Sequence, residues 1–181
     1  MYDDSPHLDR VAALARAAAR RPVVIAVDGR SGAGKTTFAE RLADRLERSL
    51  VIHVDDLCPG WDGLAAIPAL LTAQVLVPLR RGEPAAYRRF DWYADEFADL
   101  VPLPETATVI VEGAGSSVSP ARGYVDVRVW LEAGEPERKE RALARDGETY
   151  RPNWRRWADQ EDRLFAADDT RAHAHVVVHT T

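Results

Sequence analysis

A short apolar run, Val23–Val27, passes through Asp28 directly into a glycine-rich segment and then into an amphipathic stretch. The segment Gly29–Thr36 reads GRSGAGKT and has the spacing G-x-x-x-x-G-K-[ST]. In this pattern the glycines let the backbone curl until its amides point inward, next to the N-terminus of the following helix. A β-branched run without alternation is typical of a strand that is covered on both faces. We therefore expect a phosphate-binding loop between a buried parallel strand and a helix.

The rest of the chain alternates between strand and helix patterns. Strands are expected at 23–27, 50–54, 108–111, 125–131 and 175–179, and helices at 8–20, 35–48, 64–80, 136–145 and 153–167. This order predicts an α/β fold with one doubly wound parallel sheet of about five strands, covered by helices on both faces. The alternation within 125–131 predicts a more exposed strand, and the aromatic, proline-rich stretch 82–104 predicts an ordered loop with short helical pieces.

Composition narrows the class of protein. A chain of 181 residues with 46% apolar residues can bury a core, so we expect a single domain over 1–181. The net charge of −5 argues against a nucleic-acid partner, which requires a basic face. The N-terminus is acidic, so we expect no signal peptide. The sequence has no run of 18 consecutive apolar residues, so we expect no membrane span and no membrane partner. The single cysteine, Cys58, cannot form an internal disulfide, so we expect a location in the reducing cytoplasm. The sequence does not exclude a homo-oligomer.

The phosphate-binding loop predicts a nucleotide ligand. Its lysine, Lys35, would reach the β- and γ-phosphates of ATP or GTP, and the hydroxyl of Thr36 would bind Mg²⁺. The remaining candidate contacts to the nucleotide lie in the loop and at the start of its helix: Gly29, Ser31, Gly32, Ala33, Gly34 and Thr37.

Acidic residues follow two further strands, where ligands of a parallel sheet collect. Glu112 comes directly after an apolar strand and suits the magnesium side of a phosphoryl-transfer site. Asp55 and Asp56 end the second strand, and either could face the acceptor and take the proton of its hydroxyl group. The alternative is that these carboxylates only cap a loop.

Five segments, IAVDGRSGAGKTTFAERLA, HVDDL, RRFDWY, VIVEG and ERKERALARD, resemble the uridine kinase group of P-loop kinases in order and spacing. The resemblance spans roughly residues 22–179. It implies that Asp55 is the general base, although Leu57-Cys58 stands where the family has an aromatic pair. It also implies that Phe90, Asp91 and Trp92 lie near the sugar and base of a nucleoside, where the family has tyrosine, aspartate and phenylalanine. Asp56, next to the expected base, is a further candidate contact to the substrate. The alternative is that these aromatics only anchor a loop.

Arginines recur on one predicted helix, within a segment of about 135–152 that resembles the family's lid. Arg138, Arg141 and Arg145 are spaced three and four apart and share one helical face, with Ala142 in place of a fourth arginine. The resemblance implies that Arg141 and Arg145 stabilise the transferring phosphoryl group and that Arg138 contacts substrate. A solvated charged face is the alternative, because arginine is abundant in this chain.

Together these residues predict an ATP-dependent kinase that phosphorylates a hydroxyl of a small molecule, with a nucleoside as the expected acceptor. The expected catalytic residues are Lys35, Asp55, Arg141 and Arg145. A second hypothesis is a kinase for a nucleoside monophosphate or another small metabolite, which would require an arginine in the acceptor pocket. The candidates are Arg80, Arg81, Arg88 and Arg89, and Arg88 or Arg89 facing the cleft would favour it. The third hypothesis is a nucleotide-binding switch without transfer.

Overall fold

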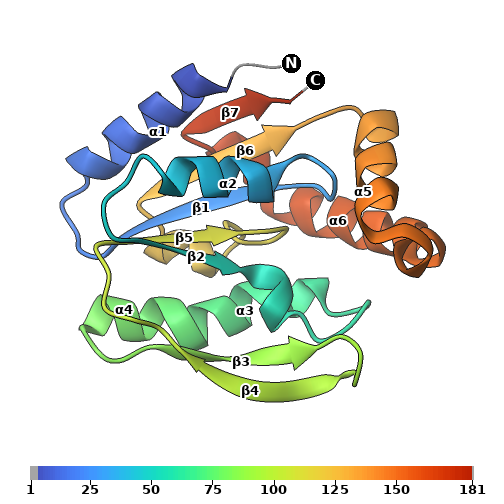
Figure 1. Ribbon diagram of the computed structural model, residues 1–181, viewed down its shortest axis with the longest axis horizontal. Helices are drawn as coiled ribbons and strands as arrows, with labels where there is room; N and C mark the ends of the chain where they lie inside the picture. The colour runs from blue at the N-terminus through green and yellow to red at the C-terminus, as the bar shows by residue number, and fades with distance from the viewer. Residues whose placement is uncertain (1–3, 181) are drawn as a thin grey trace.

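The computed structural model describes residues 4–180, apart from the side chain of Asp146. Its centre is a five-stranded sheet in the order β2-β5-β1-β6-β7, and all four neighbouring pairs are parallel (Figure 1). The strands are β1 (Val23–Gly29), β2 (Ser49–His53), β5 (Thr108–Glu112), β6 (Val127–Glu132) and β7 (Val176–His179). This arrangement confirms the predicted doubly wound parallel sheet.

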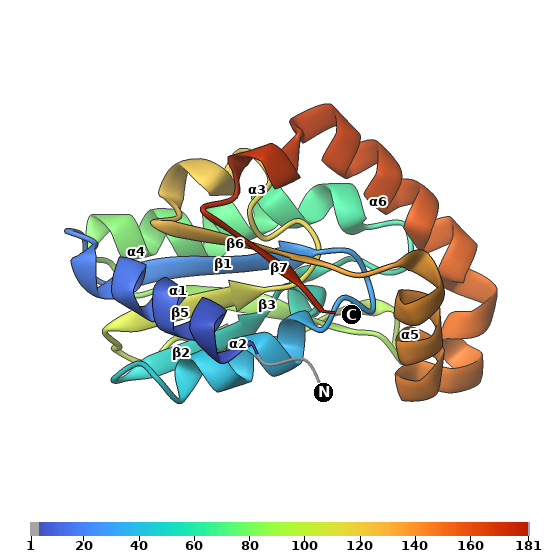
Figure 2. The same ribbon diagram turned by 90° about the horizontal axis from the view of Figure 1, so that it is seen from above.

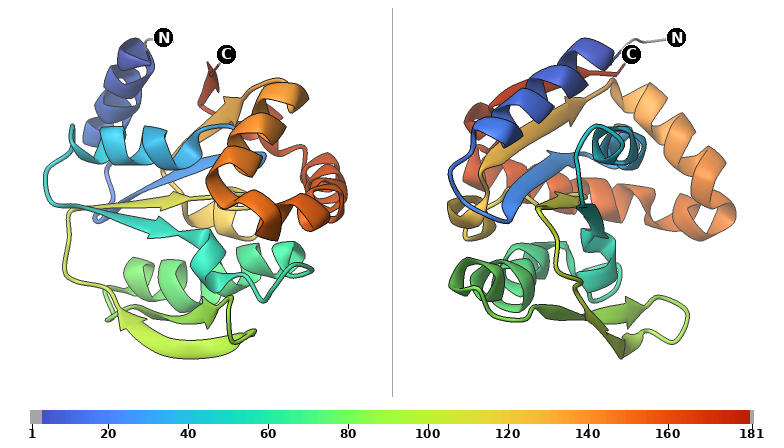
Figure 3. Two further views of the ribbon diagram at one scale, coloured as in Figure 1. Left: turned by 45° about the vertical axis from the view of Figure 1, so that its right-hand side comes forward. Right: turned by 60° about the vertical axis from the view of Figure 1, so that its left-hand side comes forward.

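Helices cover both faces of the sheet, and the two faces bury different side chains. On one face, α1 (Ser5–Ala17) and α2 (Lys35–Ala43) pack over Ile25 and Ile110 (Figure 3). On the other face lie a long helical run and α6 (Trp154–Asp168), which contributes Trp157 to the core. The helix α5 (Glu135–Tyr150) stands at the carboxyl end of the strands, where Figures 1 and 2 show it beside the start of α2.

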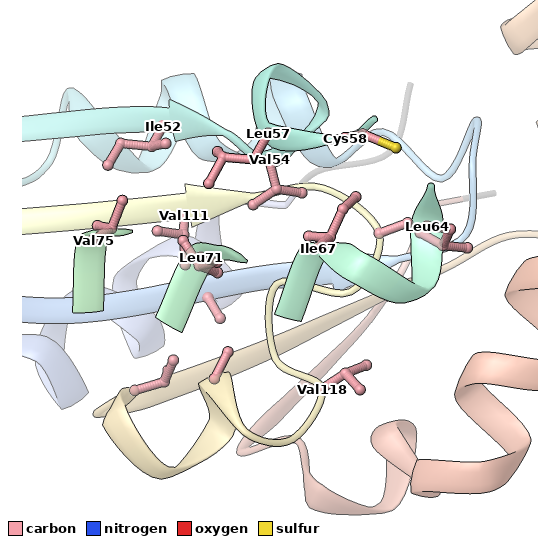
Figure 4. Close-up of a cluster of buried hydrophobic side chains, with 14 of the residues drawn as sticks. Ile52, Val54, Leu57, Cys58, Leu64, Ile67, Leu71, Val75, Val111 and Val118 are labelled. Atoms are coloured by element: carbon pink, nitrogen blue, oxygen red, sulfur yellow. The ribbon is translucent and has the colours of Figure 1, made fainter. Parts of the chain in front are cut away.

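The long helical run begins at Leu64 and ends at Arg81. It comprises a 3₁₀ turn (Leu64–Ala66), α3 (Ile67–Leu71), a π-helical turn (Thr72–Leu76) and α4 (Val77–Arg81). Ile67, Leu71 and Val75 pack against side chains of β2 and β5 (Figure 4). By length and composition alone, this is the one helix among the described residues that could cross a membrane. Here its apolar face is buried under the sheet, as in a core helix.

The stretch 82–104 is a β-hairpin, so the prediction of a loop with helical pieces was wrong. Strands β3 (Ala86–Asp91) and β4 (Glu96–Pro102) pair antiparallel beneath α3 and α4 (Figure 1). A register shift between Arg88 and Phe90 interrupts the alternation that would have revealed the strand. The turn is held by the carboxylate of Asp91, which accepts hydrogen bonds from the N–H groups of Tyr93 (2.8 Å) and Ala94 (3.0 Å).

Two smaller expectations also need correction. Strand β6 lies inside the sheet, between β1 and β7, and is not the more exposed strand that its alternation predicted. Its polar residue Arg128 has a partner, because its Nε donates to the carbonyl of His173 at 2.7 Å. The second helix ends at Ala43 rather than near residue 48. There the Ser49 hydroxyl donates to the Ala43 carbonyl at 3.1 Å, and tight turns lead into β2.

Candidate active site

The glycine-rich loop joins β1 to α2 with the geometry that its sequence predicts. Gly34, directly before α2, has φ 90°, and Gly32 has φ 78°, a region that favours glycine. A Cβ at Gly32 would also collide with the backbone carbonyl of Arg138 in α5. The loop therefore packs directly against α5, and a larger residue at Gly32 would push the two apart. Within the loop, Nζ of Lys35 donates to the carbonyl of Arg30 at 2.9 Å.

A cavity of about 390 Å³ opens over this loop, and we call it the phosphate cavity. It is lined by Gly32, Gly34, Lys35, Thr36, Thr37, Arg141, Ala142 and Arg145. The lining combines three cationic side chains with the N-terminus of α2, an arrangement that attracts phosphate groups. Most of the predicted nucleotide contacts thus share one cavity with two of the predicted catalytic arginines.

The side chains of Thr36 and Glu112 meet at the edge of the phosphate cavity. The Thr36 hydroxyl donates to Oε1 of Glu112 at 3.2 Å. A hydroxyl and a carboxylate are hard oxygen ligands of the kind that Mg²⁺ prefers, so both residues fit the predicted metal role. Among the residues that the structure describes, no group of three or more His, Cys, Asp and Glu residues could hold a metal ion. A magnesium ion here would take its further ligands from nucleotide phosphates and water.

His53, which the sequence interpretation missed, also binds Glu112. Its Nδ1 lies 2.5 Å from Oε1 of Glu112. This hydrogen bond raises the pKa of His53 against the opposing effect of burial. His53 is the last residue of β2 and pairs in register with Glu112 of β5, so the sheet itself brings the two side chains together. The sequence alone could not pair His53 with Glu112, because the pairing depends on β2 and β5 being neighbours in the sheet.

Asp28, at the end of β1, holds the segment that follows Glu112. Its buried carboxylate accepts hydrogen bonds from the N–H groups of Gly29, Gly115 and Ser117 and from the Ser117 hydroxyl, at 2.8–3.0 Å. Burial raises the pKa of Asp28, and these hydrogen bonds lower it in part. Asp28 thus fixes the two strand ends that carry the phosphate-binding loop and Glu112.

A second cavity, of about 490 Å³, lies next to the first, and we call it the acceptor cavity. It is lined by Ser31, Asp55, Trp61, Trp92, Arg145, Thr149, Tyr150 and Trp157. Arg145 of α5 lines both cavities. The predicted base Asp55 and the predicted phosphate-binding lysine therefore lie in adjoining cavities, with one arginine between them.

The structure separates the roles of the two neighbouring aspartates. Asp55 is exposed to the acceptor cavity, yet the protein around it displaces water and raises its pKa, against the opposing influence of Lys35. Asp56 turns instead to the hairpin, where it accepts a hydrogen bond from the hydroxyl of Tyr87 at 3.2 Å. Of the two, Asp55 is the one that lines the cavity.

Of the three hairpin residues predicted to bind substrate, one lines the acceptor cavity and two make contacts within the hairpin. Trp92 lines the acceptor cavity, and its indole N–H donates to the carbonyl of Asp55 at 3.1 Å. Phe90 is buried and packs edge-to-face against Phe97, with ring centroids 5.3 Å apart. The carboxylate of Asp91 holds the hairpin turn, and its hydrogen bonds to that turn lower its pKa. Only Trp92 of this trio lines the cavity, whereas the arrangement gives Phe90 and Asp91 structural contacts.

The arginines of α5 have three different environments. Arg138 is buried and donates to the carbonyls of Ser31 and Ala133, each at 3.2 Å, so its guanidinium holds the loop rather than lining the acceptor cavity. Arg141 lines the phosphate cavity and donates to the carbonyl of Thr180 at 2.6 Å. The Thr180 hydroxyl in turn donates to the carbonyl of Ala33 at 2.9 Å. Arg145 alone reaches both cavities.

Ser31 is held by three groups from the two helices at the end of the sheet. Its N–H donates to Glu161 at 2.7 Å, and its carbonyl accepts from Arg138. The Tyr150 hydroxyl donates to the Ser31 hydroxyl at 2.8 Å. Glu161 and Tyr150 are functional candidates that the sequence interpretation missed. The one indication in the sequence is that Glu161 follows Trp157 by four residues, which places a glutamate on the apolar face of α6 that packs into the core.

The arginines that would have indicated a monophosphate acceptor lie elsewhere. Arg80 donates to the carbonyl of Pro22 (2.9 Å) and to Asp126 (2.6 Å), the residues directly before β1 and β6, at the amino ends of the strands. Arg89 pairs with Asp99 at 2.6 Å on the exposed hairpin, and Arg88 donates to the carbonyl of Ala98 on the same hairpin. None of these arginines lines the acceptor cavity. The observation that would have favoured a monophosphate acceptor is therefore not met.

The sheet order and the strand–loop–helix unit define a P-loop fold of the nucleoside- and nucleotide-kinase type. Within this class the chain resembles a possible uridine kinase from Bacillus stearothermophilus, with a TM-score of 0.70 and 19% identity over 96% of this chain and 97% of that one. It also resembles a proposed fructose transport system kinase from Silicibacter sp. TM1040, with a TM-score of 0.59 and 21% identity over 98% of this chain and 99% of that one.

These likenesses confirm the uridine kinase-like fold that the sequence segments predicted. At such identities they concern the fold and not the substrate. No protein-family model matches the chain, and no curated protein sequence matches it.

Proposed function

We propose that this protein is an ATP-dependent phosphotransferase, which moves the γ-phosphoryl group to a hydroxyl of a small molecule bound in the acceptor cavity. The observation that carries the proposal is that Arg145 lines both cavities. One cavity has the lining of a triphosphate site, and the other contains a carboxylate suited to a hydroxyl group. A cationic side chain between two such sites stands where charge develops during transfer.

In the proposed reaction, Lys35 and the loop amides hold the triphosphate. Asp55 orients the acceptor hydroxyl and takes its proton as the hydroxyl oxygen bonds to the γ-phosphorus. The bond between that phosphorus and the bridging oxygen breaks, and ADP leaves. Arg145 stabilises the charge on the transferring group, while Arg141 fixes the outer wall of the phosphate cavity through Thr180. A magnesium ion held by Thr36 and Glu112 would neutralise phosphate charge.

Because one structural neighbour is described as a possible uridine kinase, a nucleoside is the first acceptor to test, and GTP is an alternative donor. The experiment measures ADP release from ATP and Mg²⁺ with a panel of nucleosides, nucleoside monophosphates, sugars and small alcohols. We expect one class of alcohol to raise the rate well above that with ATP alone. Lys35→Ala should lower this acceptor-dependent rate by at least about 100-fold, because the lysine stabilises transferring charge.

Two results would replace the proposal. If ATP binds but no acceptor raises ADP release, and if Asp55→Asn leaves the ATP-only rate unchanged, the protein is a nucleotide-dependent switch. If only monophosphates act as acceptors, the second hypothesis from the sequence holds. The latter result would require an anionic group to bind where Arg145 is the one cationic lining residue.

A further inference from the structure

We infer that the acceptor is an alcohol that carries a positively charged nitrogen, such as a quaternary ammonium group. This inference rests on the proposed function, because it takes the second cavity as the acceptor site. It goes further in naming the charge of the substrate. Three properties of the cavity carry it: the orientation of its rings, the hydrogen bonds that its polar groups already make, and the distribution of charge around it.

The rings form a corner and not a parallel slot. Trp61 lies at the centre, and Trp92 and Trp157 stand edge-on to it, at interplanar angles of 68° and 90°. The one near-parallel pair, Trp61 and Tyr150, is stacked face to face at 5.4 Å, which leaves no space for a ring between them. A flat neutral base here could stack on one ring face at a time, whereas a rounded cationic head can contact several ring faces at once.

The polar atoms of three of these four rings, those of Trp92, Trp157 and Tyr150, are already bonded to the protein. The indole N–H of Trp92 donates to the Asp55 carbonyl, and that of Trp157 donates to Glu161 at 3.1 Å. The hydroxyl of Tyr150 donates to Ser31. The aromatic wall therefore offers few hydrogen bonds to a sugar or to the edge of a nucleobase. An alkylated ammonium head requires none, because ring faces and a carboxylate stabilise its charge.

The charges of the cavity favour a cation at its aromatic end. Asp55 is the one carboxylate among the lining residues, and Asp56 and Glu112 are close enough to raise its pKa. Burial raises the pKa of Tyr150, and Glu161 and Asp55 raise it further, against the opposing effects of the hydrogen bond to Ser31 and of Arg145. Of the opposing cations, Lys35 lines the phosphate cavity and Arg145 lines both cavities, and a bound triphosphate would neutralise their charge.

The test compares choline with 3,3-dimethylbutan-1-ol, a neutral alcohol of the same shape. Isothermal titration of each into the whole protein with ADP and Mg²⁺ isolates the effect of the charge. We expect choline to bind at least about tenfold more tightly, a difference within the range of a desolvated cation–π contact. Trp61→Leu and Asp55→Asn should each reduce this preference. Tyr93→Leu serves as a control, because Tyr93 is fully exposed on the hairpin turn and does not line the cavity.

Should Trp61→Leu fail to fold, Trp92→Leu at the half-exposed rim provides the same comparison. Equal binding of the two alcohols, or binding of neither, overturns the inference. ADP release distinguishes this failure from failure of the proposed function. Transfer to uridine without a preference for choline would keep the kinase and discard the cationic acceptor. A preference for choline without transfer to any alcohol would keep the cation site and discard the kinase.

Discussion

Glu161 of α6 accepts a hydrogen bond from the backbone N–H of Ser31 in the phosphate-binding loop, at 2.7 Å. The same oxygen, Oε1, accepts the indole N–H of Trp157 at 3.1 Å. Ser31 and Trp157 both line the acceptor cavity. One carboxylate that is only 1% exposed therefore links the phosphate-binding loop to the aromatic wall of the neighbouring cavity.

Replacing this carboxylate should lower both the stability of the fold and the affinity of the phosphate-binding loop for ATP. Glu161→Ala leaves two buried donors without their partner, so we expect the free energy of unfolding to fall by about 1–3 kcal/mol. We also expect weaker ATP binding, because Ser31 is no longer held. Glu161→Gln retains an acceptor oxygen and should lose less of both. Urea unfolding and titration calorimetry with ATP measure the two effects, and equal losses in the two variants would contradict this role.

The charge of Glu161 predicts a pH dependence of stability. Burial raises the pKa of this carboxyl above its ordinary value of 4.5, against the influence of Lys35. The folded protein then binds the proton more tightly than the unfolded chain does. The contribution of the protonated carboxyl to the stability of the fold is complete below the unfolded pKa, and it is lost as the pH rises through the folded pKa. As the pH rises above the unfolded pKa, the stability of Glu161→Gln should therefore rise relative to the wild type.

The two neighbouring aspartates should respond differently to the same substitution. Asp55→Asn removes the carboxylate from the acceptor cavity, and we expect acceptor-dependent ADP release to fall by about 10²–10⁴-fold with ATP binding retained. Asp56→Asn keeps an oxygen that can accept from Tyr87, so its rate should remain within a few-fold of the wild type. The reverse order of effects would assign the acceptor to Asp56.

The acid limb of the pH–rate profile should report Asp55. Because its surroundings raise its pKa above 3.8, the rate should begin to fall at a higher pH than for an ordinary aspartate. Arg145 lowers the pKa of Asp55, so Arg145→Gln should shift the acid limb to still higher pH, besides slowing transfer. A limb that stays in place or moves to lower pH would show that another group titrates.

Asp28 should be among the most sensitive positions for stability. Asp28→Ala leaves three buried N–H groups and one hydroxyl without their acceptor, and we expect a loss of at least about 3 kcal/mol in the free energy of unfolding. Asp99→Ala is the matched control, because its pair with Arg89 is exposed to solvent and should contribute little to stability. Similar losses at the two positions, measured by urea unfolding, would argue against this role of Asp28.

The parts of the fold that could be predicted from sequence depend on local order. The phosphate-binding loop, its flanking strand and the buried strands leave clear patterns in the sequence, because the residues that define each of them are consecutive. The hairpin did not, because the register shift near Arg88 breaks its period of two. Glu161 could not be assigned to Ser31 across 130 positions of sequence. The inward turn of Arg138 depends on how α5 meets the loop, which the spacing of its arginines does not fix.

Trp61 contacts rings from three other segments: Trp92 on the hairpin, Tyr150 at the end of α5 and Trp157 in α6. A substitution at Trp61 changes the space available to the other three rings, and a substitution at any of those three changes the surroundings of Trp61. A change of substrate in this scaffold would thus require concerted substitutions in segments that are far apart in the gene. Selection or directed evolution that varies one loop at a time would sample mainly losses, whereas libraries that randomise these four positions together could reach new acceptors.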